Sequence, residues 1–399
     1  MGTRSQPRSG LFRDFTDIAR RAVRSLAMPT ACLVLLGQGV AQCGEGPERG
    51  IRANAVVENP RPKMADLFAR DGKIRGVNLV AGRRFSEGSL SPLLHDHVEW
   101  LVLGPFGWQE NTASTEVRLA TRDVMWSESD TGIVAITRLA RLHGMRIMLK
   151  PQIWITRPEE GKWLADIDPG SDANWSRWFD TYRRFILHYA VLAEGAGIEA
   201  LCVGAELHRS VKQRPGDWIG LIAAVRAVYH GRLTYAANWN EEVSDVTFWD
   251  RLDFIGVQAY YPLTDKLEPS VADLVAAWRP ISASLARLSG NHHLPILFTE
   301  VGWKSTPDAA ARPWEWSENL SGRTIRVSTG TQARAYDAFF SVFWHEPWFA
   351  GALIWKWYAN HAASGGPESI DFTPQNKPAE SVMSQWFARV SAGRTRGAR

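Results

Sequence analysis

Residues 200–206 read ALCVGAE and residues 295–300 read PILFTE, two apolar runs that each end in a glutamate. Continuous apolar runs of this length are typical of strands that are buried on both faces, as in a parallel sheet. A carboxylate at the end of such a strand, Glu206 or Glu300, is costly to bury unless it is paired or used. The two runs therefore predict a parallel α/β protein and mark two candidate functional carboxyls.

Short apolar segments alternate with longer amphipathic ones on both sides of these runs. The expected strands are Ile74–Val80, Trp100–Phe106, Arg146–Trp154, Ala200–Glu206, Leu233–Trp239, Phe254–Tyr260, Ile296–Glu300 and Ala350–Trp357. The expected helices are Gly132–His143, Trp175–Ala196, Trp218–Tyr229, Val271–Leu288, Gln332–His345 and Ala379–Val390, with short ones near Leu93–Val98 and Val246–Trp249. Eight strand–helix units over about 315 residues predict a single-domain (β/α)₈ barrel of the TIM type. A doubly wound open sheet is the alternative, but its usual glycine-rich phosphate turn is absent.

The first 43 residues have the composition of an export signal. A basic region ends at Arg24, and the apolar stretch from Leu26 to Ala41 is too short and interrupted for a comfortable membrane span. Cys43 is a weak candidate for lipid attachment, because Gln42 replaces the small residue usual before a modified cysteine. We expect an exported protein, periplasmic or extracellular. Its parts are a signal (1–43), a linker (44–70), the barrel domain (71–392) and a basic tail (393–399).

The charge distribution argues against a nucleic-acid partner. Six arginines and two aspartates within residues 1–43 account for the net charge of +4, and the remainder has 40 basic and 40 acidic residues. CxxC, HExxH and GxGxxG patterns are absent, so we expect neither a metal nor an organic cofactor. Of the three cysteines, Cys202 lies in an expected strand and reads as a small buried residue. We expect a monomer.

Polar and aromatic side chains gather at the C-terminal ends of the expected strands, where (β/α)₈ enzymes carry their active sites. Besides the two glutamates they are Asn78, Trp108, Lys150, Gln152, Trp154, Asn238, Tyr260, Trp303 and Trp355. Lys150, Gln152 and Trp154 are expected on one face of the third strand, because side chains alternate along a strand.

Two carboxyls about 5–5.5 Å apart hydrolyse a glycosidic bond with retention, one as nucleophile and one as acid/base. Tyr260 is the candidate donor to the nucleophile, and Trp355 is the candidate floor under the reacting sugar. Lys150 and Asn238 are candidates to hold sugar hydroxyls. The partner indicated is a polysaccharide or oligosaccharide, and nineteen tryptophans are available to stack on its rings.

A long insertion, Asp308–Gly330, follows the seventh expected strand and contains Trp314 and Trp316. Long loops next to a site are often functional, so we expect a wall for additional sugar units. Trp163 is expected to face the same cleft. Three other tryptophans lie in expected helices and are assigned to the core: Trp175, Trp178 and Trp218.

Five short stretches carry a resemblance to a known family. They are residues 75–78 (RGVN), 148–151 (MLKP), 204–207 (GAEL), 258–261 (QAYY) and 299–303 (TEVGW). The chain resembles glycoside hydrolase clan A, whose signature is a glutamate at the end of strands four and seven of a (β/α)₈ barrel. It looks most like family 113, whose known members are endo-β-1,4-mannanases. The resemblance covers residues 74–387 and implies that Glu206 is the acid/base, Glu300 the nucleophile and β-mannan the favoured substrate.

The sequence departs from the expected pattern at two positions. Ala205 occupies a place where many clan members have an asparagine that holds the sugar 2-hydroxyl, and Asn238 is a candidate substitute. Gln152 occupies a place where a histidine is expected after Lys150-Pro151, which leaves the exact substrate open.

Other functions stay open at this point. A related β-glycan hydrolase or a transglycosylase would use the same covalent intermediate. A non-catalytic barrel that binds glycan is an alternative from another class, although both glutamates weigh against it. A metal-dependent barrel hydrolase is disfavoured, because no His/Asp cluster lies at the expected strand ends.

Overall fold

The computed structural model describes residues 71–119, 124–316 and 326–389. All of them belong to one of the two compact units into which the chain divides, and the other, Leu11–Arg61, lies outside the described residues. The expected export signal, linker, Cys43 and basic tail also lie outside them. Among the described helices, none combines the length and apolar character needed to cross a membrane.

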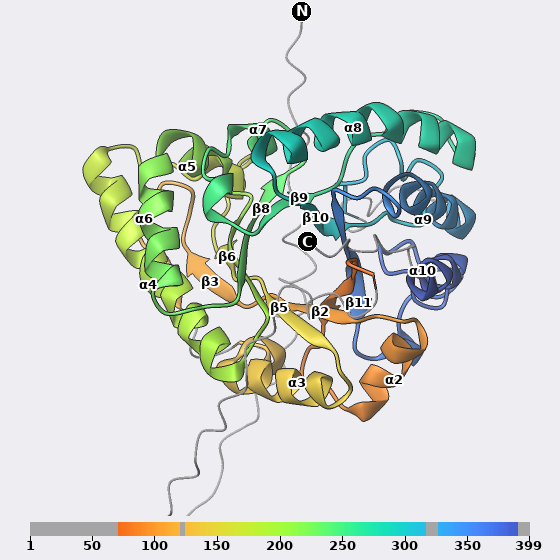
Figure 1. Cartoon of the computed structure of the whole chain (residues 1–399), viewed down its shortest axis with the longest axis horizontal. Coiled ribbons are helices and arrows are strands. Elements are labelled where there is room, and N and C mark those ends of the chain that lie inside the picture. Colours follow the sequence, from red (N-terminus) through yellow and green to blue (C-terminus); the bar gives the residue numbers. More distant parts are fainter. Residues whose placement is uncertain (1–70, 120–123, 317–325, 390–399) are drawn as a thin grey trace, which may run out of the picture. The chain divides into compact units, whose positions relative to one another are not determined.

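Eight parallel strands close into a barrel in the order β1-β11-β10-β9-β8-β7-β5-β2 (Figure 1). They are β1 (Ile74–Val80), β2 (Trp100–Leu103), β5 (Arg146–Leu149), β7 (Ala200–Ala205), β8 (Arg232–Asn238), β9 (Phe254–Gln258), β10 (Ile296–Val301) and β11 (Phe349–Tyr358). Each one overlaps an expected strand. The predicted (β/α)₈ barrel is therefore confirmed.

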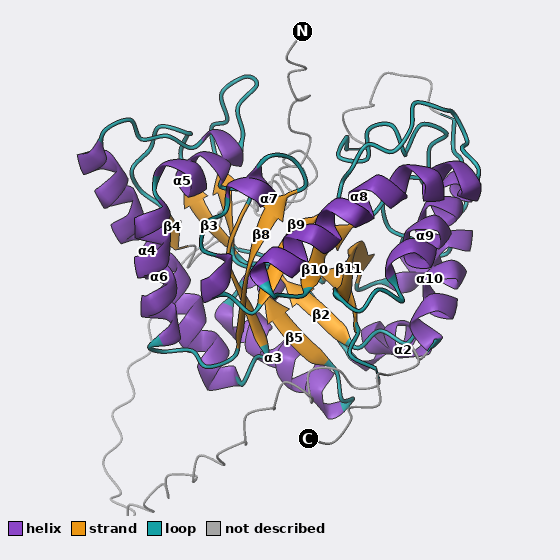
Figure 2. Cartoon of the chain, turned by 45° about the horizontal axis from the view of Figure 1, so that its top comes forward, coloured by secondary structure: helices purple, strands orange, loops and turns teal. Residues whose placement is uncertain are grey.

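Helices cover the outside of the strands (Figure 2). The longer ones are α2 (Glu87–His95), α3 (Asp130–Leu142), α4 (Asp172–Ala196), α6 (Pro215–Arg226), α8 (Val271–His292), α9 (Thr329–Phe343) and α10 (Pro378–Ala388). Two short helices, α5 (His208–Gln213) and α7 (Glu242–Asp245), follow β7 and β8. The sequence did not predict α5. The helix expected near Val246–Trp249 is wrong, because α7 ends before it and the 3₁₀ turn η4 (Trp249–Arg251) begins only at its last residue.

Helix ends follow capping residues in the sequence. The hydroxyl of Ser129 accepts the Gly132 N–H at the start of α3, and Ser171 accepts the Asn174 N–H at the start of α4. A free N–H in the first turn of a helix has no partner within the helix, so each serine satisfies one. At the other end of α4, Gly197 takes the left-handed conformation that terminates many helices.

The second and third expected strands are each broken in two. Beyond Leu103 the chain restarts as β3 (Phe106–Gln109), and beyond Leu149 it restarts as β6 (Gln152–Ile155). Pro105 and Pro151 lie in the two breaks, where proline has no N–H to give to a ladder.

The outer halves of these strands form a separate three-stranded sheet. In it β3 pairs with β6 in parallel and with β4 (Arg118–Leu119) in antiparallel fashion. The interpretation that Lys150, Gln152 and Trp154 share one face of a single strand is therefore wrong. Lys150 stays at the end of the barrel strand, whereas Gln152 and Trp154 belong to the small sheet.

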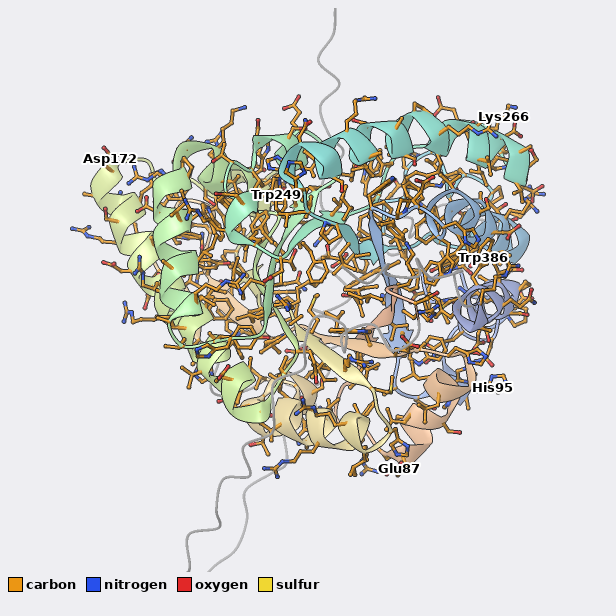
Figure 3. The ribbon with its side chains drawn as sticks, in the orientation of Figure 1. Glu87, His95, Asp172, Trp249, Lys266 and Trp386 are labelled. Carbon is orange, nitrogen blue, oxygen red and sulfur yellow. The ribbon has the colours of Figure 1, made fainter. Side chains whose placement is uncertain are left out.

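The core fills both the barrel and the layer between strands and helices. One buried cluster joins Ile74, Trp100, Met148, Phe254 and Leu297 from five barrel strands, together with other apolar side chains. Outside the barrel the three tryptophans assigned to the core are buried, as expected. Charged side chains such as Asp172 and Lys266 lie on the outside, as labelled in Figure 3.

Candidate active site

Glu206 is the residue directly after β7, and its carboxyl is buried, with 2% of the residue exposed. Its backbone lies in the left-handed region, at φ 57°, which ends the regular course of the strand. Oε1 accepts a long hydrogen bond, 3.4 Å, from Nδ2 of Asn238 at the end of β8. Oε2 is buried and has no hydrogen-bond partner. One oxygen of this carboxyl is therefore available to another group.

Glu300 lies within β10 and is 1% exposed, but its carboxyl is fully engaged. Oε1 accepts from Nζ of Lys150 and, at 3.4 Å, from Nε2 of Gln258. Oε2 accepts from the hydroxyl of Tyr260 at 2.8 Å. An ionised carboxylate only accepts hydrogen bonds, so three donors around Glu300 suit its charged form.

The two carboxyls therefore have opposite surroundings. Burial raises the pKa of Glu206 well above its ordinary value, the negative charges of Glu300 and Glu242 raise it further, and Lys150 partly offsets them. Burial and the charge of Glu300 also raise the pKa of Tyr260, so its hydroxyl stays a donor. The structure thus holds one carboxyl that favours its protonated form beside one that is surrounded by donors.

Trp355, on β11, joins this group through Lys150. The ammonium of Lys150 lies 5.6 Å from the centroid of the Trp355 ring. Trp316 of the insertion packs edge-on against the same ring, with 5.8 Å between centroids. The peptide between Trp355 and Lys356 is cis. Trp316, expected to line a wall for sugars, instead lies buried and in contact with Trp355.

Four of the expected site residues are brought to the carboxyl pair: Lys150, Asn238, Tyr260 and Trp355. Asn78, on β1, lies beside them but donates its amide to the backbone carbonyls of Thr299 and Leu353, at 3.2 and 3.1 Å. Both amide hydrogens of Asn78 are thus used to join β1 to its neighbours, and only its buried Oδ1 is without a partner.

Four expected residues have their described contacts away from the carboxyl pair: Trp303, Trp154, Gln152 and Trp108. Trp303 is buried between α8 and α9, where its ring contacts Trp278 and Tyr336. Trp154 packs edge-on against Phe106 in the small sheet, at 5.6 Å. Gln152, in the same sheet, is also buried. Trp108, opposite Trp154, completes that aromatic group.

A second aromatic group lies over the loops that follow β8, β9 and β10. Trp314 of the insertion stacks on Trp239 with 5.5 Å between centroids and an interplanar angle of 23°. Trp239 in turn contacts Tyr261 at 5.6 Å. All three residues are half-buried, so part of each remains exposed. The sequence singled out only Trp314 of these three.

Two residues of the site escaped the sequence analysis. Gln258 ends β9, in the QAYY stretch, so its place at a strand end was a usable signal. Glu242 is buried on α7, and nothing in its local sequence marks it. It became visible only through its contacts with Tyr235 and Asn238.

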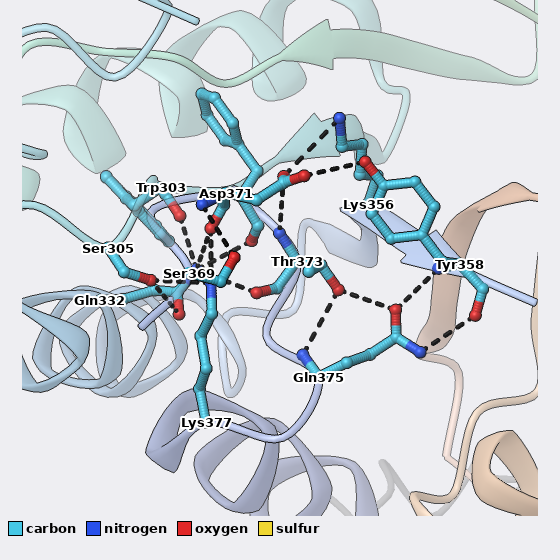
Figure 4. A network of polar contacts seen from close by, with 11 residues as sticks. Trp303, Ser305, Gln332, Lys356, Tyr358, Ser369, Asp371, Thr373, Gln375 and Lys377 are labelled. Atoms are coloured by element: carbon cyan, nitrogen blue, oxygen red, sulfur yellow. Dashed lines mark hydrogen bonds and ion pairs between the residues drawn. The ribbon is translucent and has the colours of Figure 1, made fainter. Parts of the chain in front are cut away.

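A polar network joins the loops that follow β10 and β11 (Figure 4). Nε2 of Gln332 donates to the carbonyls of Trp303 and Phe372, at 2.7 and 2.8 Å. Nζ of Lys377 donates to Ser305 Oγ at 2.9 Å and to the Asp371 carbonyl at 2.6 Å. These bonds hold two loops that are some 70 positions apart in the sequence against each other.

Within the described ranges, no group of three or more His, Cys, Asp or Glu side chains is arranged to hold a metal ion.

The chain is similar to known glycoside hydrolases in both sequence and fold. Residues 82–377 match the sequence model of Glycoside Hydrolase Family 113. A β-mannanase of this family from Alicyclobacillus acidocaldarius has 28% sequence identity and a TM-score of 0.67, over 80% of this chain and 98% of that one. A second family 113 structure, a β-1,4-mannanase, has 23% identity and a TM-score of 0.67, over 79% and 99% of the two chains.

A more distant structure shares the fold alone. A β-glucuronidase from Ruminococcus gnavus has 13% identity and a TM-score of 0.52, over 79% of this chain and 50% of that one. No curated protein gives a significant sequence match. Because the family model covers most of the chain, including both strand-end glutamates, the protein belongs to glycoside hydrolase family 113 and is a glycoside hydrolase.

Proposed function

We propose that this glycoside hydrolase cleaves β-mannan with retention of configuration, with Glu206 as acid/base and Glu300 as nucleophile. The observation that carries the proposal is the contrast between the two carboxyls. Glu206 is buried with a free oxygen and a raised pKa, whereas Glu300 accepts from three donors. Two carboxyls whose environments favour opposite protonation states are what double displacement requires.

In the first step, a carboxylate oxygen of Glu300 forms a bond to the anomeric carbon as the glycosidic bond breaks. Glu206 gives its proton to the departing oxygen, so the leaving sugar departs as an alcohol. Lys150, Gln258 and Tyr260 orient the attacking carboxylate.

In the second step, water attacks the anomeric carbon and Glu206 takes the proton of that water. Esterification removes the negative charge of Glu300, which is one of the causes of the raised pKa of Glu206. The pKa of Glu206 then falls, so the same residue becomes a base. Attack of a sugar hydroxyl instead of water would give transglycosylation by the same route.

Two further residues are assigned to sugar binding. Trp355 is proposed as the floor under the reacting sugar, because it lies next to Lys150 of the pair's hydrogen-bond network. Asn238 is proposed to hold the 2-hydroxyl, since its amide lies beside Glu206 while Ala205 offers no polar group there.

The choice of mannan rests on the β-mannanase from Alicyclobacillus acidocaldarius, which shares the fold and 28% of its sequence with this chain. Reducing-sugar release from β-mannan, glucomannan, xylan and cellulose tests it, with Glu300→Ala as control. Release from β-mannan that disappears in the variant supports the proposal. Activity on another polymer only would contradict the substrate, and activity that survives in Glu300→Ala would contradict the nucleophile.

The stereochemistry is tested by ¹H NMR of the products during the first minutes of hydrolysis. Retention gives the β-anomer first and the α-anomer only later, by mutarotation. The α-anomer as first product would show inversion, and would remove the covalent role assigned to Glu300.

A further inference from the structure

We propose that Glu242, which lies outside the reacting pair, is a positioning residue that sets the orientation of Glu206 for proton donation. The inference rests on the proposed role of Glu206 as acid/base. Glu242 is buried, with 0% of the residue exposed, and its carboxyl takes no part in the two proposed steps. A buried carboxyl must be compensated by partners for its lost hydration, so one that lies next to the site calls for an explanation.

Glu242 reaches the acid/base from two directions. Its Oε2 accepts the backbone N–H of Asn238 at 3.0 Å, and the side chain of Asn238 in turn donates to Oε1 of Glu206. Its Oε1 accepts from the hydroxyl of Tyr235. That hydroxyl oxygen accepts, at 2.7 Å, the backbone N–H of Leu207, the residue after Glu206. Both arms thus end at Glu206, one on its carboxyl and one on the adjoining backbone.

The geometry of these bonds fixes their direction. The oxygen of Tyr235 receives the Leu207 N–H, so its own proton is free to point at Glu242. Trp218 and Phe248 pack against the Tyr235 ring, with centroids at 5.2 and 5.8 Å. This apolar surround strengthens each polar contact and leaves few alternative partners.

Charge links the same groups. The charges of Glu300, Glu242 and Lys150 act on Glu206. Glu242 accepts from Tyr235 and Asn238 and lies within the electrostatic influence of His208 and Asp245, whose Nε2 and Oδ2 atoms are 2.7 Å apart. Burial raises the pKa of Glu242 to about 7, against these hydrogen bonds. When Glu242 is ionised, above about pH 7, its negative charge raises the pKa of Glu206, and loss of that charge lowers it.

A matched control, Glu199, lies at the other end of β7, the strand that Glu206 follows. Glu199 directly precedes β7 and is also buried. Its Oε2 accepts the backbone N–H of Ile147 at 2.9 Å, and its Oε1 accepts from Arg141 at 2.7 Å. Glu199 thus resembles Glu242 in residue type, burial and bonding, but it lies away from the carboxyl pair.

The test compares Glu242→Gln with Glu199→Gln in the full chain, on two substrates across the pH range. One is mannohexaose, whose leaving sugar needs a proton, and the other is a 2,4-dinitrophenyl β-mannooligoside, whose leaving group does not. We expect Glu242→Gln to lose about 10-fold or more in kcat/KM on mannohexaose and less than about 3-fold on the aryl substrate. We expect the alkaline limb of the pH profile of kcat/KM for Glu242→Gln on mannohexaose to move down by about 0.5 to 1 pH unit. Glu199→Gln should leave both the limb and the substrate ratio unchanged.

Equal losses on both substrates, or an unmoved alkaline limb, would overturn the role of Glu242. If Glu242→Gln fails to fold, as judged by its thermal melt, Tyr235→Phe cuts one arm and must show the same selective loss on mannohexaose. Glu206→Gln separates this proposal from the one beneath it. If Glu206→Gln keeps wild-type activity on mannohexaose, the acid/base assignment itself fails. If Glu206→Gln loses activity on mannohexaose while Glu242→Gln keeps the wild-type rates and pH profile, only the positioning role of Glu242 fails.

Discussion

Tyr260 and Lys150 hold Glu300 from two sides, each on a different carboxylate oxygen. Each donor comes from a different strand end, so the orientation of Glu300, the proposed nucleophile, depends on the closure of the barrel.

Removal of one donor is therefore expected to slow the reaction without unfolding the protein. Tyr260→Phe deletes only the hydroxyl that lies 2.8 Å from Oε2 of Glu300. We expect kcat/KM on mannan to fall about 10- to 100-fold, with the melting temperature within a few degrees of wild type. Tyr358→Phe is the control, since it deletes a hydroxyl at the same distance from a different carboxylate, that of Asp371. Equal kinetic losses in both variants would refute the specific role of Tyr260.

Glu128 is expected to make the stability of the fold depend on pH. Burial raises the pKa of Glu128, a half-buried residue, from 4.5 to about 7. The folded state therefore binds a proton that the unfolded state has already lost between these values. The stability linked to that proton is full below pH 4.5 and disappears as the pH rises through about 7. We expect the free energy of unfolding of Glu128→Gln, relative to that of wild type, to be about 1 to 2 kcal/mol higher at pH 8 than at pH 4.5. This range is reduced for the partial exposure of the residue.

The control for Glu128 has the opposite sign. Burial works against the charge of Glu159, but hydrogen bonds from Thr112 lower the pKa of Glu159 overall. Its contribution is present above its unfolded pKa and is lost at acid pH, so Glu159→Gln should lose stability at pH 8. Urea unfolding at several pH values measures both variants. A Glu128→Gln difference that does not change with pH would contradict the prediction.

At the scale of elements, β10 and β11 approach each other closely beside Glu300. A Cβ built on Gly302, just beyond β10, would lie 2.2 Å from the carbonyl oxygen of Trp355. No side chain fits there without a shift of the backbone of Trp355. Glycine at this position is therefore explained by close approach rather than by an unusual φ angle.

Gly302→Ala is expected to lower the free energy of unfolding by about 2 to 4 kcal/mol and to reduce activity with it. Gly290→Ala on α8 is the matched control, because nothing lies within 4 Å of its Cβ position. Replacement of a helical glycine by alanine should stabilise the protein by about 0.5 to 1 kcal/mol. Thermal melts of both variants settle the point, and equal stability of the two would contradict the argument.

At the scale of the whole molecule, the insertion after β10 serves two different surfaces. Trp316 is buried against Trp355, whereas Trp314 is half-buried and stacks on Trp239, which follows β8. Only the second placement leaves part of a ring exposed beside the strand ends. We therefore retain the substrate-wall role, as a proposal, for Trp314 alone.

Trp314→Ala tests that role. If the ring binds sugar units away from the bond that breaks, KM for mannohexaose should rise about 3- to 10-fold while kcat stays within twofold, because uniform binding is lost. The shortest mannooligosaccharide that is cleaved serves as the internal control, since it cannot reach a distant subsite. A loss of kcat on short and long substrates alike would show that Trp314 supports the fold instead.

The sequence by itself determined the barrel and the two candidate carboxyls. Strands buried on both faces need continuous apolar runs, and a strand-end carboxyl is simply the next residue in the chain, so both features are local. It also located Lys150, Asn238, Tyr260 and Trp355 in or near the C-terminal parts of strands, from which the structure brings them to the carboxyl pair.

Only the tertiary structure decided which partners each carboxyl receives. Gln258 and Tyr260 lie 42 and 40 positions from Glu300, and Lys150 lies 150 positions away. Such contacts arise when the barrel closes and have no local pattern. The same reason explains the errors. Gln152 and Trp154 do not continue the barrel strand, because Pro151 interrupts it and the residues after it pair with β3. Trp303 is buried against aromatic side chains of α8 and α9.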